Sequence, residues 1–211
     1  MNNDLLRKLN LNSKKRSEDD SNCNNSKSIV ISGPAAVGKT TLAEGLAKAF
    51  GYSVYNGGDI LKNIAKERGY KVTGKDWWDT PDAIRFMQER KKDITFDIKV
   101  DKMLIEIADK GEAVITSYTL PWLTQRPMTF WLNASSENRS KRMAKRDNIS
   151  IANALRIIRN RDGENRRIYK KIYGSQFGDN LLVFDVVLNT DLFALNSLIY
   201  ISQEIYRRAI R

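Results

Sequence analysis

A glycine-rich segment that ends in lysine and threonine is the part of this chain best suited to chemistry. It reads Gly33-Pro34-Ala35-Ala36-Val37-Gly38-Lys39-Thr40, with Thr41 next. In such a turn at a helix N-terminus, backbone N–H groups converge on phosphate oxygens, the lysine reaches the outer phosphates and the hydroxyl binds magnesium. We therefore predict a nucleotide-phosphate site over residues 33–41, in which Lys39 binds phosphate and Thr40 binds the metal.

The segments on either side of this loop are those that a phosphate site requires. An apolar strand, Ile29-Val30-Ile31, precedes it, and apolar residues follow at helical spacing, namely Leu42, Leu46, Ala47 and Phe50. The alternative is a glycine-rich turn that only caps a helix. The strand, loop and helix in sequence favour the phosphate site.

Strand and helix patterns alternate along the rest of the chain. Predicted strands cover residues 29–31, 52–55, 113–116, 128–132 and 182–188. Predicted helices cover residues 60–68 and 82–92, a segment ending at Gly111, the segment from Ser150 to Gly174, and residues 195–206. This alternation predicts an α/β fold of three layers with a central parallel five-stranded sheet, in which ligands bind beyond the carboxyl ends of the strands.

The composition narrows the class of chemistry. The 211 residues include no histidine, which removes Ser-His-Asp and Cys-His nucleophile systems and histidine-based zinc sites. One cysteine, Cys23, and the lack of any apolar run of roughly 20 residues predict a soluble protein of the reducing cytoplasm with no membrane contact. The length suits one domain, over residues 28–211, behind a disordered polar arm over residues 1–27, and we expect a monomer.

Positive charge is concentrated between Arg139 and Lys171. This segment holds twelve Lys or Arg against three Asp or Glu, in a chain whose formal net charge is +11. A helical lid that closes over a polyphosphate needs such a cluster. A nucleic-acid-binding surface is the alternative that we favour less.

A change of composition between Gly69 and Asp93 predicts an insertion over the site. It contains Trp77 and Trp78 in a polar loop. An indole ring can stack on a nucleotide base, whereas a loop tryptophan can also anchor its loop to the core. We expect one ring to take each role.

With these pieces in order, the chain resembles a nucleoside monophosphate kinase, most closely the archaeal type of cytidylate kinase, from about Ser28 to the C-terminus. The arginine-rich stretch and the motif that ends it are more specific than the phosphate loop. Besides that loop, the resemblance is carried by Gly58-Asp59-Ile60-Leu61-Lys62, the helix with Asp97 and Asp101, the run from Arg142 to Arg146, Arg159, Arg161 and Tyr169-Lys170-Lys171-Ile172-Tyr173-Gly174.

The resemblance implies transfer of the γ-phosphoryl group of ATP to CMP or dCMP with Mg²⁺. It implies a P-loop kinase fold with an acceptor-site insertion over about 69–93 and an arginine-rich lid over about 139–174. Lys39 and the loop amides would hold the ATP phosphates, Asp59 would lie at the acceptor nucleotide, and Asn189 would lie near the ATP base. The lid arginines would be Arg142, Arg146, Arg159 and Arg161.

Four positions depart from the family's pattern. Lys62 stands where relatives carry arginine, and Tyr118 stands where the arginine of an acid-Gly-Arg triplet is expected, so the bidentate fork is lost at both. Asn165 and Ile168 replace an acid and an arginine in the lid. The predicted acceptor set is Asp59, Lys62, Trp77, Trp78, Asp97, Asp101 and Tyr118, with a solvated acidic stripe as the alternative for the pair Asp97 and Asp101.

Two other functions stay open at this point. One is a kinase with another acceptor, such as AMP, dTMP or a small metabolite, because acceptor specificity lies in the segments that depart. The other is a nucleotide-binding regulator or RNA-associated protein that has lost acceptor chemistry. The retained lid arginines favour an enzyme, since a binding protein need not keep a cluster matched to a moving phosphoryl group.

Overall fold

The computed structural model describes residues 27–73, 77–124, 127–174 and 178–210. The polar arm predicted over residues 1–27 therefore lies, apart from Lys27, outside the described residues. The strands are β1 (Ile29–Ser32), β2 (Ser53–Asn56), β3 (Ala113–Thr116), β4 (Met128–Asn133) and β5 (Val186–Asn189). They form one five-stranded parallel sheet in the order β2-β3-β1-β4-β5, which confirms the predicted sheet.

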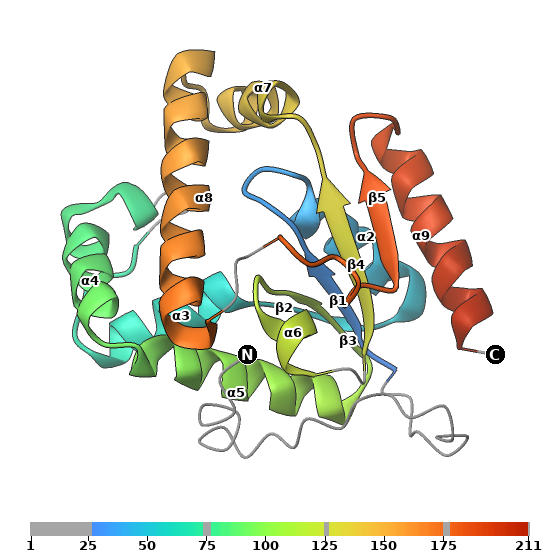
Figure 1. Ribbon diagram of the computed structural model, residues 1–211, viewed down its shortest axis with the longest axis horizontal. Helices are drawn as coiled ribbons and strands as arrows, with labels where there is room; N and C mark the ends of the chain where they lie inside the picture. The colour runs from blue at the N-terminus through green and yellow to red at the C-terminus, as the bar shows by residue number, and fades with distance from the viewer. Residues whose placement is uncertain (1–26, 74–76, 125–126, 175–177, 211) are drawn as a thin grey trace.

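Helices connect the strands and cover both faces of the sheet (Figure 1). Their bounds are α2 (Lys39–Phe50), α3 (Gly57–Glu67), α4 (Pro81–Lys92), α5 (Thr95–Lys110), α6 (Leu120–Leu123), α7 (Ser136–Asp147), α8 (Ile151–Tyr173) and α9 (Leu195–Ala209), with a 3₁₀ turn at Trp77–Asp79. One core cluster packs α2 and α9 on the sheet, and a second packs α3, α5 and the end of α8 on the opposite face. The three-layer prediction is thus confirmed.

The centre of the sheet has the sequence that its burial requires. All four residues of β1 are buried, as expected for a parallel strand between two neighbours and under helices on both faces. The chain runs from β1 toward β2 on one side and later crosses from β3 to β4 on the other, so the direction of winding reverses at β1. Ligand sites of open α/β sheets lie at such a reversal, beyond the carboxyl ends of the strands.

One predicted strand differs from the structure, and the basic segment is resolved into its helices. The last strand begins at Val186 rather than at residue 182, and Leu182 is 94% exposed. The basic segment is two helices, because Asn148 adopts a left-handed conformation (φ 52°) that ends α7 before Ser150 caps α8. The prediction that a helix begins at Ser150 and ends at Gly174 is confirmed, since these residues are its N-cap and C-cap.

Candidate active site

The phosphate loop lies between β1 and α2, where its sequence placed it. Its backbone requires the first glycine: Gly33 has φ 139°, and a Cβ atom there would lie 2.3 Å from the Leu132 carbonyl oxygen. Gly38 (φ 104°) caps the N-terminus of α2, and Ala36 has φ 60° in the left-handed region. These conformations turn the chain sharply enough for successive N–H groups to face one anion.

Lys39 lies against the loop that it follows. Its Nζ donates hydrogen bonds of 2.8 Å to the carbonyl oxygens of Gly33 and of Pro34 and lies 4.7 Å from the centre of the Tyr118 ring. Burial lowers the pKa of the Lys39 ammonium to about 7, an effect that the Asp162 carboxylate opposes and the Arg139 guanidinium reinforces. An added phosphate would strengthen the charged form of this lysine.

A cavity of about 1060 Å³ opens beside this loop at the carboxyl end of the sheet. It is continuous from Thr40 to Asp101, so it joins the phosphate loop to the helix α5. Ten residues of the predicted site line it: Lys39, Thr40, Asp59, Lys62, Trp78, Asp97, Asp101, Tyr118, Arg146 and Arg161. Within the described part of the chain, the remaining predicted residues do not line this cavity. They include residues 33–38 of the phosphate loop and Thr41, which is exposed on α2.

The outer wall of the cavity is formed at the N-terminus of α3. The Asn56 side chain caps this helix by accepting a 2.7 Å hydrogen bond from the Asp59 N–H, and its amide nitrogen also contacts the Asp59 carboxylate. Lys62, one turn on, lies 3.6 Å from that carboxylate and 5.8 Å from the centre of the Trp78 ring. Asp59, Lys62 and Trp78 thus present an acid, a cation and an aromatic face together.

The two neighbouring tryptophans differ in burial. Trp77 is fully buried, donates its indole N–H to the Lys71 carbonyl oxygen at 2.8 Å, and packs against Phe86. It anchors the loop to the core, and its predicted contact with an acceptor has no support in this placement. Trp78 is partly exposed and lines the cavity, so it is the ring available for stacking.

Asp97 and Asp101 lie at the bottom of the cavity, both buried, so the solvated acidic stripe is ruled out. Arg90 of α4 donates two hydrogen bonds to the Asp97 carboxylate, one from Nη2 to Oδ1 at 2.5 Å and one from Nε to Oδ2 at 3.1 Å. Asp101 accepts hydrogen bonds from Thr119, at 2.5 Å, and from the Tyr173 hydroxyl. Burial raises the pKa of the Asp101 carboxyl to about 7, although these hydrogen bonds oppose the shift.

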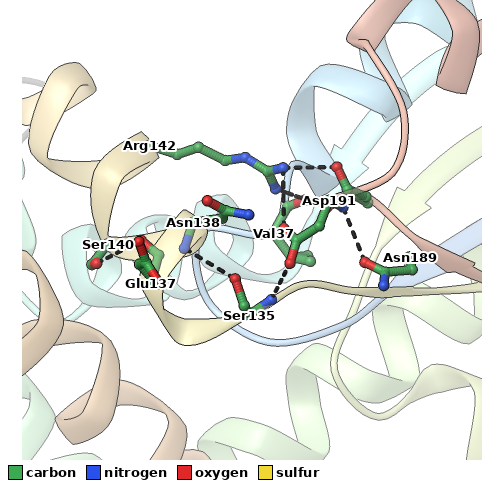
Figure 2. A network of polar contacts seen from close by, with 9 residues as sticks. Val37, Ser135, Glu137, Asn138, Ser140, Arg142, Asn189 and Asp191 are labelled. Atoms are coloured by element: carbon green, nitrogen blue, oxygen red, sulfur yellow. Dashed lines mark hydrogen bonds and ion pairs between the residues drawn. The ribbon is translucent and has the colours of Figure 1, made fainter.

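Arg142 and Asn189 belong to a polar network behind the phosphate loop (Figure 2). Arg142 donates to the Thr190 hydroxyl at 2.7 Å and to the Thr190 carbonyl oxygen at 2.8 Å, and it lies 3.6 Å from the Asp191 carboxylate. Asn189 accepts a 3.0 Å hydrogen bond from the Asp191 N–H. The network holds the loop after β5 against α7, so Arg142 is placed for supporting that loop rather than for reaching the cavity.

The other arginines of the predicted lid divide between the cavity and solvent. Arg146 and Arg161 line the cavity, and Arg146 also forms an ion pair with the neighbouring Asp147 at 2.6 Å. Arg159 is exposed and lies outside the described lining. The four positions named above as departures, Lys62, Tyr118, Asn165 and Ile168, all line the cavity.

Two buried ion pairs beside the site include residues that were not among the predicted site residues, namely Arg90, Arg139 and Asp162. Arg90 forms a buried ion pair with Asp97. Arg139 of α7 forms a second buried ion pair, 2.7 Å long, with Asp162 of α8, and both of these residues contact Ala35 of the phosphate loop. Arg90 lies in the helix predicted over residues 82–92, and the sequence offers it as a cation for the acceptor phosphate; its pairing with Asp97, seven residues later, was not predicted. Arg139 and Asp162 carry no local signal, because only the packing of α7 against α8 brings them together.

A phosphate loop after the first strand of a parallel sheet, with basic helices beyond the carboxyl ends of its strands, defines the class of P-loop kinases. Solved structures share this fold: an uncharacterized protein from Eubacterium ventriosum (16% identical, TM-score 0.63, covering 87% of this chain and 99% of that one) and shikimate kinase from Bacteroides thetaiotaomicron (17%, 0.52, 85% and 98%). No helix in the described ranges is long and apolar enough to cross a membrane.

The chain belongs to the cytidylate kinase-like family, whose model matches residues 28–192. It is 33% identical over 177 residues to a cytidylate kinase of Pyrobaculum aerophilum and 34% identical over 177 residues to one of Pyrobaculum islandicum, covering 82% of this chain and 89% of each relative. It is also 31% identical to a cytidylate kinase of Ignicoccus hospitalis over 166 residues, which are 78% of this chain and 90% of the relative.

Proposed function

We propose that this protein transfers the γ-phosphoryl group of ATP to CMP or dCMP, in the presence of Mg²⁺. The observation that carries the proposal is a continuous cavity that joins Lys39 and Thr40 to the buried acids of α5. A phosphate loop alone would fit many nucleotide-binding proteins. A second, deep and polar half of the same cavity supplies a place for an acceptor next to the transferring group.

The phosphate loop fits ATP and magnesium. The left-handed Ala36 and Gly38 shape an anion-binding turn, Lys39 lies at its rim, and the Thr40 side chain is exposed in the cavity. Lys39 would bind the outer phosphates, and Thr40 would bind magnesium, which supplies charge neutralisation of the phosphates when bound. Asn189 lies in the network behind the loop, on the side proposed for the ATP base.

The bottom of the cavity suits a cytosine base. Cytosine presents an exocyclic amine that donates hydrogen bonds, beside ring acceptors. Asp97 and Asp101 provide buried carboxyl oxygens, and Arg90 supplies donors on the same wall. Asp59, Lys62 and Trp78 then form the outer wall, where an aromatic face and a cation can hold the base and phosphate of the acceptor.

Transfer itself needs positioning and charge stabilisation. The attacking group is an oxygen of the acceptor phosphate, already anionic, so no general base is required. Arg146 and Arg161, from two different helices, face the cavity and would stabilise the charge that spreads over the equatorial oxygens. Closure of the helices α7 and α8 over the site would exclude water and limit hydrolysis of ATP.

The experiment that tests the proposal is ADP formation from Mg-ATP, with CMP, dCMP, UMP, AMP and dTMP supplied one at a time. We expect turnover with CMP or dCMP, and its loss in Lys39→Ala. Faster turnover with AMP or dTMP would show that the acceptor is another nucleotide. The four residues that depart from the family's pattern would then be the ones that select it. Binding of RNA that weakens steeply with salt, without turnover, would support a regulator instead.

A further inference from the structure

The buried ion pair between α7 and α8 contacts the phosphate loop at Ala35. Arg139 Nη1 lies 2.7 Å from Asp162 Oδ2, and both residues are 9% exposed. The same Nη1 donates to the Ala35 carbonyl oxygen at 3.0 Å, and the Ala35 N–H donates to Asp162 Oδ1 at 3.0 Å. The two partners of one ion pair therefore hold both polar groups of Ala35.

The residue that follows is the one whose backbone most needs support. Ala36 has φ 60°, a conformation that L-residues with a Cβ adopt at a cost and keep only where the surroundings fix it. On the N-terminal side, Lys39 already holds the carbonyl oxygens of Gly33 and Pro34. The ion pair fixes the next peptide groups, so the loop is held continuously up to the strained residue.

We infer that Arg139 and Asp162 are positioning residues for nucleotide binding: through Ala35 they hold the phosphate loop in the conformation that points its following N–H groups at phosphate. Both are described residues and neither lines the cavity. They therefore act without contacting the nucleotide, through the loop backbone and, to a lesser degree, through their charges near Lys39. The inference rests on the proposed ATP site and deepens it.

The same contact orients the lid. Asp162 follows Arg161 in α8, and its bond to the phosphate loop fixes the rotation of α8 about its axis at this point. Arg161 then lies on the wall of the cavity. One carboxylate thus sets the loop and, through its helix, the arginine proposed to stabilise the transferring group.

A purely structural role is the competing explanation, because breaking a buried ion pair also destabilises the fold. The two explanations differ in ligand selectivity. Loss of loop positioning weakens binding of the ADP phosphates at the loop and leaves the end of the cavity formed by Asp97 and Asp101, where the CMP base is proposed to bind, unchanged. General loss of structure weakens both ligands together.

The test is calorimetric binding of Mg-ADP and, separately, of CMP to the full chain, with thermal unfolding of each variant. Asp162→Asn should weaken ADP binding about tenfold or more, the effect of a loop that must be ordered by its ligand, and should change the Kd for CMP less than twofold. Asp162→Glu restores the charge and should bind ADP more tightly than Asp162→Asn does. Glu137→Gln, which removes a charge from the exposed Lys141 pair on α7, is the control and should bind both ligands normally.

If Asp162→Asn does not fold, Arg139→Lys tests the same contact, because it keeps the charge on a shorter reach to Ala35 and should also weaken ADP selectively. Unchanged ADP binding would overturn the inference, as would equal losses for ADP and CMP. Tighter ADP binding would overturn it as well, because the carboxylate would then compete with phosphate for the loop. Wild-type protein that binds no ADP would refute the proposed function, and the inference with it.

Discussion

Removing Arg90 should destabilise this protein far more than removing an exposed cation. Arg90 and Asp97 have side chains only 5% exposed, joined by two hydrogen bonds, so Arg90→Met would leave the Asp97 carboxylate buried without its partner. Breaking a buried pair from one side costs about 3–5 kcal/mol. In a domain of this size, about 1 kcal/mol corresponds to roughly 2–4 °C in Tm, so we expect a fall of roughly 6–20 °C.

The structure also predicts how this loss is recovered. The double variant Arg90→Met, Asp97→Leu replaces both ions by apolar groups and should regain most of the lost stability, because no unpaired charge remains. Its Kd for CMP should stay weak, since the pocket has lost its donors and acceptor. The double variant would then recover stability without recovering CMP binding, which would show that the two effects of the ion pair are independent.

Urea unfolding followed by circular dichroism, with calorimetric titration of CMP, measures both effects. Lys99→Met is the matched control, because its pair with Glu67 is 3.0 Å long but has side chains 54% and 65% exposed, and its unfolding midpoint should hardly move. A Lys99→Met midpoint shift as large as that of Arg90→Met would refute the argument from burial. So would a double variant no more stable than Arg90→Met alone.

Three further predictions concern the cavity. Arg161→Ala should lower kcat more than it weakens ATP binding, and an equal loss in the measured Kd for ATP would argue against a transition-state role. Trp78→Ala should weaken CMP binding by the roughly 1–3 kcal/mol of a lost stacking contact, whereas Trp77→Ala should cost about 3–5 kcal/mol of stability; titration and urea unfolding would show the reverse pattern if the two rings were exchanged. Burial raises the pKa of Asp101 in the folded state to about 7, whereas the ordinary value of 3.8 applies in the unfolded chain. Between these values only the unfolded chain loses the proton, so stability should fall as pH rises through this range. Asp101→Asn should flatten that slope in unfolding curves measured from pH 4 to pH 8, and an unchanged slope would contradict the assignment.

The features predicted from sequence are those coded by neighbouring residues. The phosphate loop, its strand and its helix are contiguous, and Ser150 and Gly174 mark the ends of α8 because caps are local. Trp77 and Trp78 could not be told apart in advance, since adjacent residues of a loop point in directions that only the packing of Phe86 decides.

Other parts of the site depend on contacts between distant segments. Asp97 and Asp101 share a helix face at a spacing that suits solvent as well as a pocket, and their burial depends on α4 and on the end of α8. Arg142 is one of several arginines in a basic run, and its place in the network with Thr190 follows from the packing of α7 against the loop after β5 (Figure 2). The chain's local patterns carry no information on these contacts.

The helix α8 has a consequence for how far this site can vary. Asp162 contacts the phosphate loop, and Tyr173, near the other end of the same helix, contacts Asp101 at the bottom of the cavity. At a rise of about 1.5 Å per residue, the eleven steps from Asp162 to Tyr173 place these two contacts roughly 16 Å apart along the helix. The helix therefore fixes the distance between the two halves of the site. One residue inserted between these contacts would turn one end by about 100° relative to the other. Related chains can therefore exchange the side chains of α8 that face neither the loop nor the cavity, but a change of length between Asp162 and Tyr173 would put these two contacts out of register.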